Sequence, residues 1–371
     1  MRSALLLIAC GLALALCAAS AGAVPQQEGV LRALDASASV IDLARTGVVW
    51  RREIETRSES QFFRLHLAEI RLPSNADFVL RIHARNDELL LTVSSAELAS
   101  RSGYWTSYLS GTYALIEIEN RRARSGSLSI RIAEIGEEAR VAKPLSAQDK
   151  LNRKDLPLRF FAEQPGVMAA ARSVAKLGFT KGRLMLSCTG FLVAPDLLLT
   201  NQHCFDAAAE CESAVAIFGY EQDAELNDRV GEEQRCLKVE AFDAGLDFSL
   251  IRLSGSPGNR WGVLHWSVAP LHVDEALYVV QHPAGRPKRV ALNGCQLSHV
   301  LVVGRLANQP TDLGHVCDTG EGSSGSPVLD LHNQVVGLHH LGFSDTDSNW
   351  SRENRAVRAS FILDRISSFI H

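Results

Sequence analysis

Hydrophobic and polar residues alternate along several short segments in the first third of the chain. Successive side chains of a β-strand point to opposite faces of a sheet, so this period of two predicts strands that are buried on one side. Turn residues separate the segments, as at 73–75 and 85–88. The alternation predicts an antiparallel β-sandwich within a domain spanning 24–140. Its apolar positions are Phe63, Leu65 and Leu67, Phe78, Leu80 and Ile82, Ala114, Ile116 and Ile118, and Leu128, Ile130 and Ile132.

A polar stretch that contains two prolines divides the chain, and a second β-rich region follows it. We expect a linker at 141–157 and a second domain at 158–371. Apolar runs predict strands in this domain at 189–194, 214–220, 249–253, 277–281, 327–331 and 335–338. The final apolar residues recur at helical spacing, which predicts a terminal amphipathic helix with an apolar face of Phe361, Ile362, Ile366, Phe369 and Ile370.

The first residues, MRSALLLIACGLALALCAASAGA, combine a positive start, an apolar stretch and small residues at the end. This order predicts a secretory signal peptide at 1–23 that is removed before Val24. A membrane anchor is the alternative, and the short stretch, its interruption by Gly11 and its small-residue end disfavour it. We therefore expect a secreted protein, extracellular or periplasmic, with no membrane association after cleavage.

Net charge changes this picture little, whereas the cysteines add to it. The 371 residues carry a formal net charge of −4 with no long run of either sign, which disfavours binding to nucleic acid or to an anionic membrane surface. Six cysteines remain after the signal peptide, and in an oxidising compartment this even number predicts disulfides with 15 possible connectivities. No C-x-x-C pair indicates zinc, and we expect no metal or other cofactor.

The stretch GEGSSGSPV at 320–328 holds three serines within four residues. A serine hydroxyl is a poor nucleophile at neutral pH, so it needs a neighbouring base, usually histidine, and a carboxylate that orients the base. His203 follows an apolar strand, and Asp247 directly precedes another. Asp243 is the competing carboxylate, but it lies in a small-residue turn with no strand directly after it.

Cysteines flank the predicted hairpin that ends at His203. A disulfide between Cys188 and Cys204 would fasten the histidine loop to the first strand of that hairpin. Sequence proximity favours Cys211–Cys236 and Cys295–Cys317 as the other pairs, and the last would brace the segment that leads to the serines.

The segments around the histidine and the serines resemble those of the trypsin/chymotrypsin superfamily. "LLTNQHC" is similar to that family's TAAHC segment, and Gly322-Ser323-Ser324-Gly325-Ser326-Pro327 is similar to its G-D-S-G-G-P signature. The variant G-x-S-G-S-P looks closest to the bacterial glutamyl-endopeptidase-like branch. The order His, Asp, Ser and the separations of 44 and 77 residues fit this branch.

The resemblance implies a chymotrypsin-like double β-barrel and a serine-type endopeptidase that acts on polypeptides. In such an enzyme Ser324 would be the nucleophile, His203 the base and Asp247 the carboxylate that orients the base. The backbone N–H groups of Gly322 and Ser324 would form the oxyanion hole. The alternative from another class is a catalytically silent binding or adhesion protein on the same scaffold.

Two departures from the trypsin pattern concern activation and specificity. Trypsin has an aspartate before its nucleophile that captures a newly freed N-terminus, and here that residue is Ser323, so either the first domain is a propeptide or the enzyme is competent as one chain. Asp318 matches the trypsin-like acid that binds Lys or Arg, whereas Thr319 and His339 match the pair that glutamyl endopeptidases use. A His–hydroxyl pair suits a carboxylate, so we favour an acidic P1 residue.

Two further motifs are weaker. Adjacent residues of a strand point to opposite faces, so His339 and His340 are not expected to bind one metal ion. The second SGSP copy, at 254–257, lacks the preceding glycine and the following apolar strand, so we interpret it as a surface turn.

The first domain loosely resembles the β-sandwich modules of secreted bacterial peptidases. Core and edge packing is the expected role of its aromatic residues Tyr104, Trp105 and Tyr108, and a patch for a glycan or protein ligand is the alternative.

Overall fold

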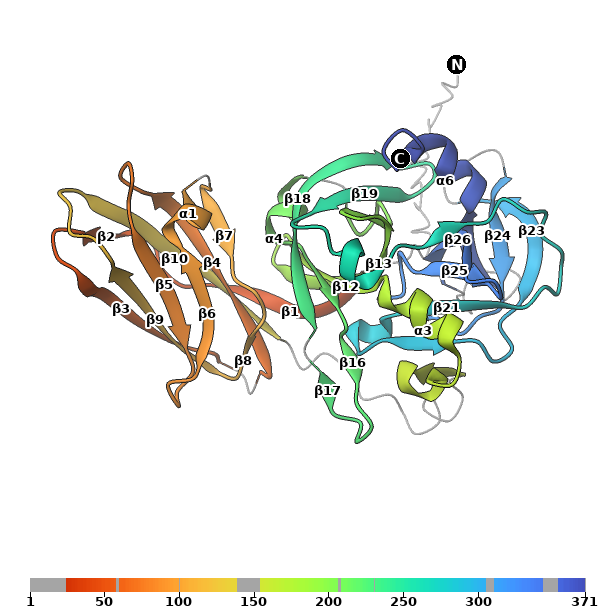
Figure 1. Ribbon diagram of the computed structural model, residues 1–371, viewed down its shortest axis with the longest axis horizontal. Coiled ribbons are helices and arrows are strands. Elements are labelled where there is room, and N and C mark those ends of the chain that lie inside the picture. Colours follow the sequence, from red (N-terminus) through yellow and green to blue (C-terminus); the bar gives the residue numbers. More distant parts are fainter. Residues whose placement is uncertain are drawn as a thin grey trace, which may run out of the picture.

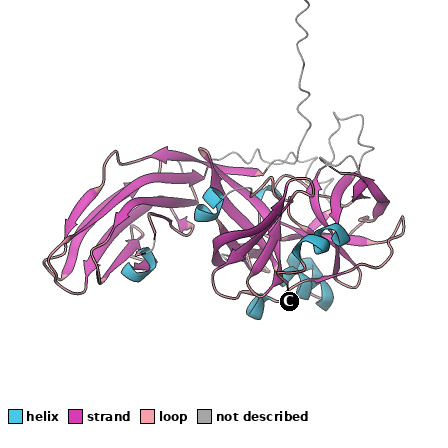
Figure 2. Cartoon of the chain, turned by 90° about the horizontal axis from the view of Figure 1, so that it is seen from above, coloured by secondary structure: helices cyan, strands magenta, loops and turns pink. Residues whose placement is uncertain are grey.

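The computed structural model is an elongated, mostly β molecule in which a sandwich is followed by two barrels (Figures 1 and 2). It describes residues 25–57, 60–99, 101–138, 154–205, 208–229, 231–304, 310–342 and 353–370. The expected all-β fold class, with a sandwich, a double barrel and a C-terminal helix, is confirmed. The predicted signal peptide and most of the predicted linker lie outside the described residues. Within the described ranges, the structure has no helix that is long and apolar enough to cross a membrane.

Two sheets form the sandwich, and their facing sides hold one apolar core. The first is the four-stranded sheet β3-β9-β5-β6, made of Gly47–Glu55, Tyr113–Asn120, Phe78–His83 and Leu89–Ser94. The second contains β1 (Gln26–Ala33), β2 (Ser39–Asp42), β4 (Phe62–Arg71), β7 (Gly103–Trp105), β8 (Leu109–Ser110) and β10 (Ser127–Glu138). A short helix, α1 (Ser95–Leu98), follows β6. The alternating apolar residues predicted from the sequence are buried in this core.

Six antiparallel strands close the first barrel, because the outer strands of the series also pair with each other. In order they are β12 (Val174–Lys181), β15 (Val215–Phe218), β18 (Glu232–Asp243), β19 (Phe248–Leu253), β14 (Leu197–Thr200) and β13 (Leu184–Ala194). The helices η1 (Leu158–Phe161), α3 (Pro165–Arg172), α4 (Ala208–Ser213) and α5 (Gly258–Trp261) and the ribbon of β16 (Glu221–Gln222) and β17 (Asp228–Arg229) complete this part.

The second barrel is built on a nine-stranded sheet. Its strands are β11 (Asp155–Pro157), β20 (His265–Trp266), β21 (Leu277–Gln281), β22 (Arg289–Ala291), β23 (Leu297–Val303), β24 (Pro310–His315), β25 (Pro327–Asp330), β26 (Gln334–Leu341) and β27 (Asn354–Arg358). Strand β11 pairs with β22, so the end of the predicted linker belongs to this barrel. The turn η2 (Pro283–Gly285) joins β21 to β22, and helix α6 (Ala359–Ile366) ends the fold with Ile362 and Ile366 buried.

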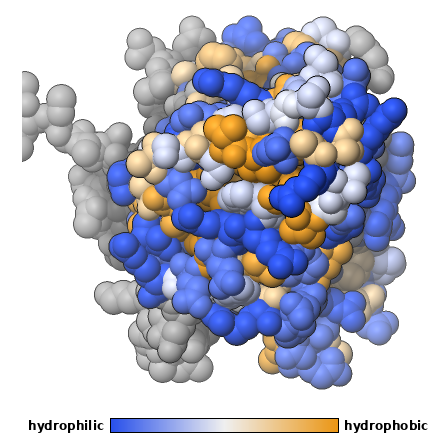
Figure 3. All heavy atoms as spheres, turned by 90° about the vertical axis from the view of Figure 1, so that its left-hand side faces the viewer, coloured by the Kyte–Doolittle hydropathy of each residue, from blue (hydrophilic) through white to orange (hydrophobic). Residues whose placement is uncertain are grey.

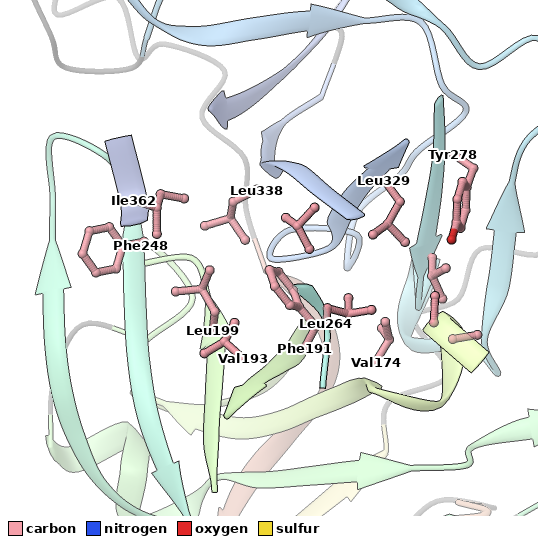
Figure 4. Close-up of a cluster of buried hydrophobic side chains, with 14 of the residues drawn as sticks. Val174, Phe191, Val193, Leu199, Phe248, Leu264, Tyr278, Leu329, Leu338 and Ile362 are labelled. Carbon is pink, nitrogen blue, oxygen red and sulfur yellow. The ribbon is translucent and has the colours of Figure 1, made fainter. Parts of the chain in front are cut away.

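A large apolar cluster joins the two barrels (Figure 4). It combines side chains from the first barrel, such as Phe191 and Leu199, with others from the second, such as Leu329 and Leu338, and with Ile362 of α6. The stability gained on folding is roughly proportional to the apolar surface removed from water. This shared cluster therefore holds the two barrels together as one unit. A site at the seam between them is therefore built on fixed elements.

The sandwich and the first barrel share one continuous twelve-stranded sheet. Strand β1 makes this connection because it pairs with β10 of the sandwich along one edge and with β13 of the barrel along the other. In Figure 1 it runs from the sandwich into the barrel. The two parts expected from the sequence are thus joined by backbone hydrogen bonds as well as by the covalent linker.

The three aromatic residues proposed as a binding patch do not form an exposed surface. Tyr104 and Trp105 are buried at the junction with the first barrel, where Arg235 donates hydrogen bonds to the Tyr104 hydroxyl and the Trp105 carbonyl at 2.7 and 2.6 Å. Tyr108 donates to Glu28 of β1. Figure 3, which views the sandwich end, shows apolar side chains scattered among polar ones. Packing is therefore the role of Tyr104 and Trp105, whereas Tyr108 is half-buried and lines a cavity together with Glu28 and Lys176. A ligand of the sandwich stays a prediction.

All three expected cysteine pairs are disulfides in the structure. They are Cys188–Cys204, Cys211–Cys236 and Cys295–Cys317. The first two lie in the first barrel, and the third joins the segment before β23 to the segment that follows β24. Each one fastens a loop whose ends the strands already bring close together.

Candidate active site

Antiparallel pairing places the two groups His203 and Asp247 at the same end of the first barrel. Strand β14 ends at Thr200, which pairs with Ser249 near the start of β19. The segment after β14 and the segment before β19 therefore meet, although they are separated by 44 residues along the chain. The Cys188–Cys204 disulfide then fastens the residue next to His203 to strand β13.

The Asp247 carboxylate holds His203 through two hydrogen bonds. His203 Nδ1 lies 2.8 Å from Asp247 Oδ2, and the His203 backbone N–H donates to Asp247 Oδ1 at 2.9 Å. The Asp247 carbonyl in turn accepts from the Asn201 side chain and from the Gln202 N–H. Asp243 is the competing carboxylate. In the described part of the chain, its side chain accepts the turn N–H groups of Gly245 and Leu246 and forms an ion pair with Arg365.

Asp247 is fully buried and ionised. Burial opposes its ionisation, but hydrogen bonds and positive charge from His203 and His340 outweigh burial and hold the pKa of this carboxyl well below its ordinary value. Its backbone has a φ of +48°, which an aspartate tolerates better than most residues. Nε2 of His203, the nitrogen on the far side of the ring, has no hydrogen-bond partner in the described part of the chain.

Ser324 lies on the tight loop that precedes β25, and strand β13 holds this loop. The Thr189 N–H donates to the Ser324 carbonyl, and the Thr189 hydroxyl donates to the Gly322 carbonyl, both at 2.8 Å. Thr189 follows Cys188, whose disulfide partner follows His203. One strand thus fastens both the histidine loop and the serine loop. No hydrogen bond between Ser324 and His203 is present among the described residues.

Two glycines allow the serine loop to turn as it does. Gly322 and Gly325 have φ values of +87° and +86°, which residues with a Cβ atom rarely adopt. A Cβ on Gly322 would also lie 2.8 Å from the His282 carbonyl, and one on Gly325 would collide with Thr189. The G-x-S-G pattern therefore reflects crowding on both sides of Ser324.

The backbone around Ser324 leaves two N–H groups unused. Within the described ranges, no backbone hydrogen bond uses the N–H of Gly322 or that of Ser324. The intervening Ser323 N–H donates to the Gly320 carbonyl, and the Ser323 hydroxyl accepts from the Gly320 N–H at 3.1 Å. Ser323 thus braces its own loop locally, at the position where the trypsin pattern has an aspartate.

The turn η2 packs against the serine loop from the second barrel. The Ala284 N–H donates to the Glu321 carbonyl at 2.6 Å, which ties the peptide bond preceding Gly322 to η2. The His282 N–H donates to the Thr189 hydroxyl that also binds Gly322. This network fixes the direction of the Gly322 N–H.

The candidate specificity residues differ in their contacts. The Asp318 carboxylate accepts the backbone N–H groups of Lys154 and Asp155 at 2.7 and 3.2 Å, so it is engaged by the segment that enters β11. His339 is buried, and its Nδ1 lies 3.1 Å from Nε2 of His315. Burial first, and then the neighbouring histidines, lower the pKa of His339 well below its ordinary value. Thr319 is half-buried on the loop that follows Asp318.

Sequence reasoning missed two residues that the structure places at the site, His340 and Asp312. In the sequence, His340 stands out only as half of a metal pair with His339. The adjacent histidines do differ in their partners, because His340 contacts Asp247 and Asp312 whereas His339 contacts His315. No local motif in the sequence marks Asp312.

His203 and the two neighbouring cysteines are of residue types that bind metal ions, but their chemistry excludes a metal site. The ligand atoms of Cys188, His203 and Cys204 lie within 4.8 Å of one another. The two sulfur atoms form a disulfide and cannot act as thiolates.

The second SGSP copy is a turn, as expected. It leads into α5 instead of a strand, and the Ser254 hydroxyl accepts from the Arg235 N–H and donates to Gln234.

Comparison with known proteins agrees with this architecture. Residues 188–338 match the family model of the trypsin-like peptidase domain. This match falls within the double barrel, so the second unit is similar to a trypsin-like peptidase domain.

Curated relatives match only a part of this chain. The chain is 32% identical over 196 residues to the secreted RxLR effector protein 73 of Plasmopara viticola, covering 47% of this chain and 46% of that protein. It is 33% identical over 172 residues to the uncharacterized protein y4fB of Sinorhizobium fredii, covering 42% of this chain and 25% of that protein. The chain thus spans less than half the length of these relatives.

Solved structures that this chain matches in part include peptidases. The active form of the Rv3671c protease of M. tuberculosis has a TM-score of 0.44 at 18% identity, covering 57% of this chain and 86% of that chain. A Glu endopeptidase structure has a TM-score of 0.42 at 21% identity, covering 59% of this chain and 97% of that chain.

Proposed function

We propose that this protein is a secreted serine endopeptidase in which Ser324, His203 and Asp247 form the catalytic triad. The observation that carries the proposal is the His203–Asp247 hydrogen bond of 2.8 Å beside a serine loop held by the same strand. A free Nε2 on His203 and two unused N–H groups at Gly322 and Ser324 supply the other parts that acyl transfer requires. The three disulfides fit an oxidising compartment.

The proposed reaction proceeds through an acyl-enzyme. Ser324 Oγ attacks the scissile carbonyl while His203 Nε2 takes the hydroxyl proton, and Asp247 stabilises the imidazolium that forms. The N–H groups of Gly322 and Ser324 donate to the oxyanion of the tetrahedral intermediate. His203 then gives the proton to the leaving amine. Water, activated by His203 in the same way, hydrolyses the ester and regenerates Ser324.

An active-site serine probe tests this proposal directly. We expect a fluorophosphonate probe to label the folded protein at one residue, and peptide mapping to place the label on Ser324 instead of Ser323 or Ser326. Only Ser324 has a base and a pair of free N–H groups assigned to it, so its neighbours should stay unmodified. Failure of the folded protein to label would support the alternative, a silent binding protein on a peptidase scaffold.

We also propose that the enzyme prefers an acidic residue at P1, through Thr319 and His339. The engagement of the Asp318 carboxylate by two backbone N–H groups supports this choice, because an acid held in that way is a poor partner for a substrate cation. The His315–His339 contact would fix which nitrogen of His339 carries its proton.

Cleavage-site mapping on a mixed peptide library checks this preference. We expect Glu or Asp before the scissile bond, and we expect Thr319→Val to raise KM for acidic substrates about tenfold because it removes one hydroxyl donor. Asp318→Asn should leave the P1 preference acidic. A preference for Lys or Arg that is lost in Asp318→Asn would show that Asp318 defines the pocket.

A further inference from the structure

His340 occupies an unusual position between two buried carboxylates. Its Nδ1 lies 3.1 Å from Asp247 Oδ2, and its Nε2 lies 2.7 Å from Asp312 Oδ2. His340 and both carboxylates are almost completely inaccessible to water. The resulting row of side chains runs from Asp312 through His340 and Asp247 to His203.

The fold builds this row from three separate places. Asp247 precedes β19 in the first barrel, whereas His340 on β26 and Asp312 on β24 belong to the second barrel. Strand β27 pairs with both β24 and β26 and sets their spacing. The register between β26 and β27 shifts between His339 and Leu341, so His340 is the extra residue of a β-bulge. Bulges re-aim side chains, and this one directs His340 toward Asp247.

The hydrogen-bond pattern requires a doubly protonated imidazole. An ionised carboxylate only accepts hydrogen bonds, so each His340 nitrogen that faces one must carry a proton. Asp312 also accepts the Thr311 hydroxyl at 2.9 Å through its other oxygen, Oδ1. Burial opposes charge on His340, but Asp312 and Asp247 outweigh burial and raise its pKa to about 9.

The other titratable groups around His340 add no competing charge at neutral pH. His315 on β24 and His339 on β26 both have lowered pKa values, because burial and neighbouring histidines disfavour their charged forms. His203 contacts the same oxygen of Asp247, Oδ2, that His340 contacts. The row therefore contains two carboxylates and one resident cation, which leaves one negative charge for His203 to neutralise when it accepts the serine proton.

We propose that His340, held by Asp312, is a positioning residue for the triad: a buried imidazolium that orients Asp247 and limits how readily His203 takes up a proton from solvent. This inference rests on the proposed peptidase function. The positive ring lies between Asp312 and Asp247, so His203 senses the cation at shorter range than the second carboxylate. The nearby cation thus opposes a second positive charge on His203. His203 can therefore act as a base at a lower pH than it could beside the Asp247 carboxylate alone.

The first test reads the charge of His340 without any catalysis. In the ¹⁵N-labelled full-length Ser324→Ala protein, NMR at pH 7.5 should show both ring nitrogens of His340 bonded to hydrogen. In Ser324→Ala/Asp312→Asn, one of these N–H signals should be lost, since a neutral amide no longer stabilises the cation. A single N–H on His340 in the first protein would overturn the proposal, whether or not the native chain is a peptidase.

The second test measures the effect on the site. Asp312→Asn in the otherwise native chain should move the acidic limb of the kcat/KM pH profile upward by about 0.5–1 unit, because loss of the nearby cation makes protonation of His203 easier. KM should change less than kcat. Asp274→Asn, an exposed change in the same barrel, should leave the limb in place. An unmoved limb in Asp312→Asn would overturn the positioning role.

Folding is controlled separately. If Asp312→Asn does not fold, His340→Gln/Asp312→Asn replaces it, because it removes both charges and leaves no buried carboxylate without its partner. The same upward movement of the acidic limb is expected, and a fixed limb would again contradict the proposal. Absence of labelling and cleavage in the native protein would instead contradict the proposed function. The NMR result on the protonation of His340 would still hold.

Discussion

Replacing Ser324 with alanine is expected to lower kcat by a factor on the order of 10⁴–10⁶ while the fold and the substrate affinity stay close to those of the native protein. The hydroxyl is the only group in the proposed mechanism that forms a bond to the substrate, so no neighbour can replace it. Ser323 and Ser326 are fully buried, and the Ser323 hydroxyl is occupied by the Gly320 N–H. The measurement is steady-state cleavage of a peptide that the native enzyme accepts.

Ser256→Ala provides the matched control for this change. Ser256 belongs to the second SGSP copy, is exposed, and lies in the turn before α5. We expect activity within about twofold of native, since an exposed substitution away from the site rarely changes stability by more than about 0.5 kcal/mol. Comparable activity of Ser324→Ala and the native chain would refute the assignment of the nucleophile.

Glu28→Ala is expected to destabilise the whole molecule by about 3 kcal/mol and to lower kcat by about 10- to 100-fold under conditions where the variant is still folded. Glu28 lies on β1 and forms an ion pair of 2.5 Å with Lys176 of the first barrel. It also accepts the Tyr108 hydroxyl of the sandwich at 3.0 Å. The substitution would leave a nearly buried ammonium without its partner.

The expected loss of activity follows from the contact between Glu28 and η2. A Cβ atom on Gly285 would collide with the Glu28 carboxylate, which shows how closely β1 packs on this turn. The neighbouring Ala284 holds the Glu321 carbonyl and with it the direction of the Gly322 N–H. The N-terminal strand thus supports the proposed oxyanion hole from behind, in a protein whose Ser323 cannot capture a freed N-terminus.

These contacts favour a single-chain enzyme over one that discards its sandwich as a propeptide. Chemical denaturation and peptide cleavage measure the two effects of Glu28→Ala. Glu55→Ala, which removes an exposed ion pair with Arg85 on the sandwich, is the control and should cost less than about 1 kcal/mol. Increased activity in Glu28→Ala would instead indicate that the N-terminal part restrains the enzyme.

Local sequence signals were sufficient for several features of the structure. The period of two located the strands of the sandwich, since burial on one face leaves a direct mark on the order of residues. The hairpin with Cys188 and Cys204 at its ends predicted that disulfide, because residues that a hairpin brings together are close in sequence. His203 and Asp247 were paired from a resemblance, and their hydrogen bond is present.

Other features were wrong or missed because they depend on distant pairings. The alternative reading of Tyr104, Trp105 and Tyr108 as a binding patch rests on neighbours in sequence, whereas Tyr104 and Trp105 are buried and accept hydrogen bonds from Arg235, 131 residues beyond Tyr104. The end of the predicted linker pairs as β11 with β22, more than 130 residues later. No local pattern in the sequence of β1 indicates that it pairs with both the sandwich and the first barrel.

By itself, the sequence determined the class of fold, the strands, the three cysteine pairs and the residues proposed as triad, because periodicity, spacing and short motifs are local properties of a chain. Only the tertiary structure decided that β1 unites the sandwich with the barrel and that His340 lies between Asp247 and Asp312. Asp247 and His340 are 93 residues apart and come from different barrels. Their contact results from how the two barrels pack, and a buried charge of this kind is defined by its surroundings in space.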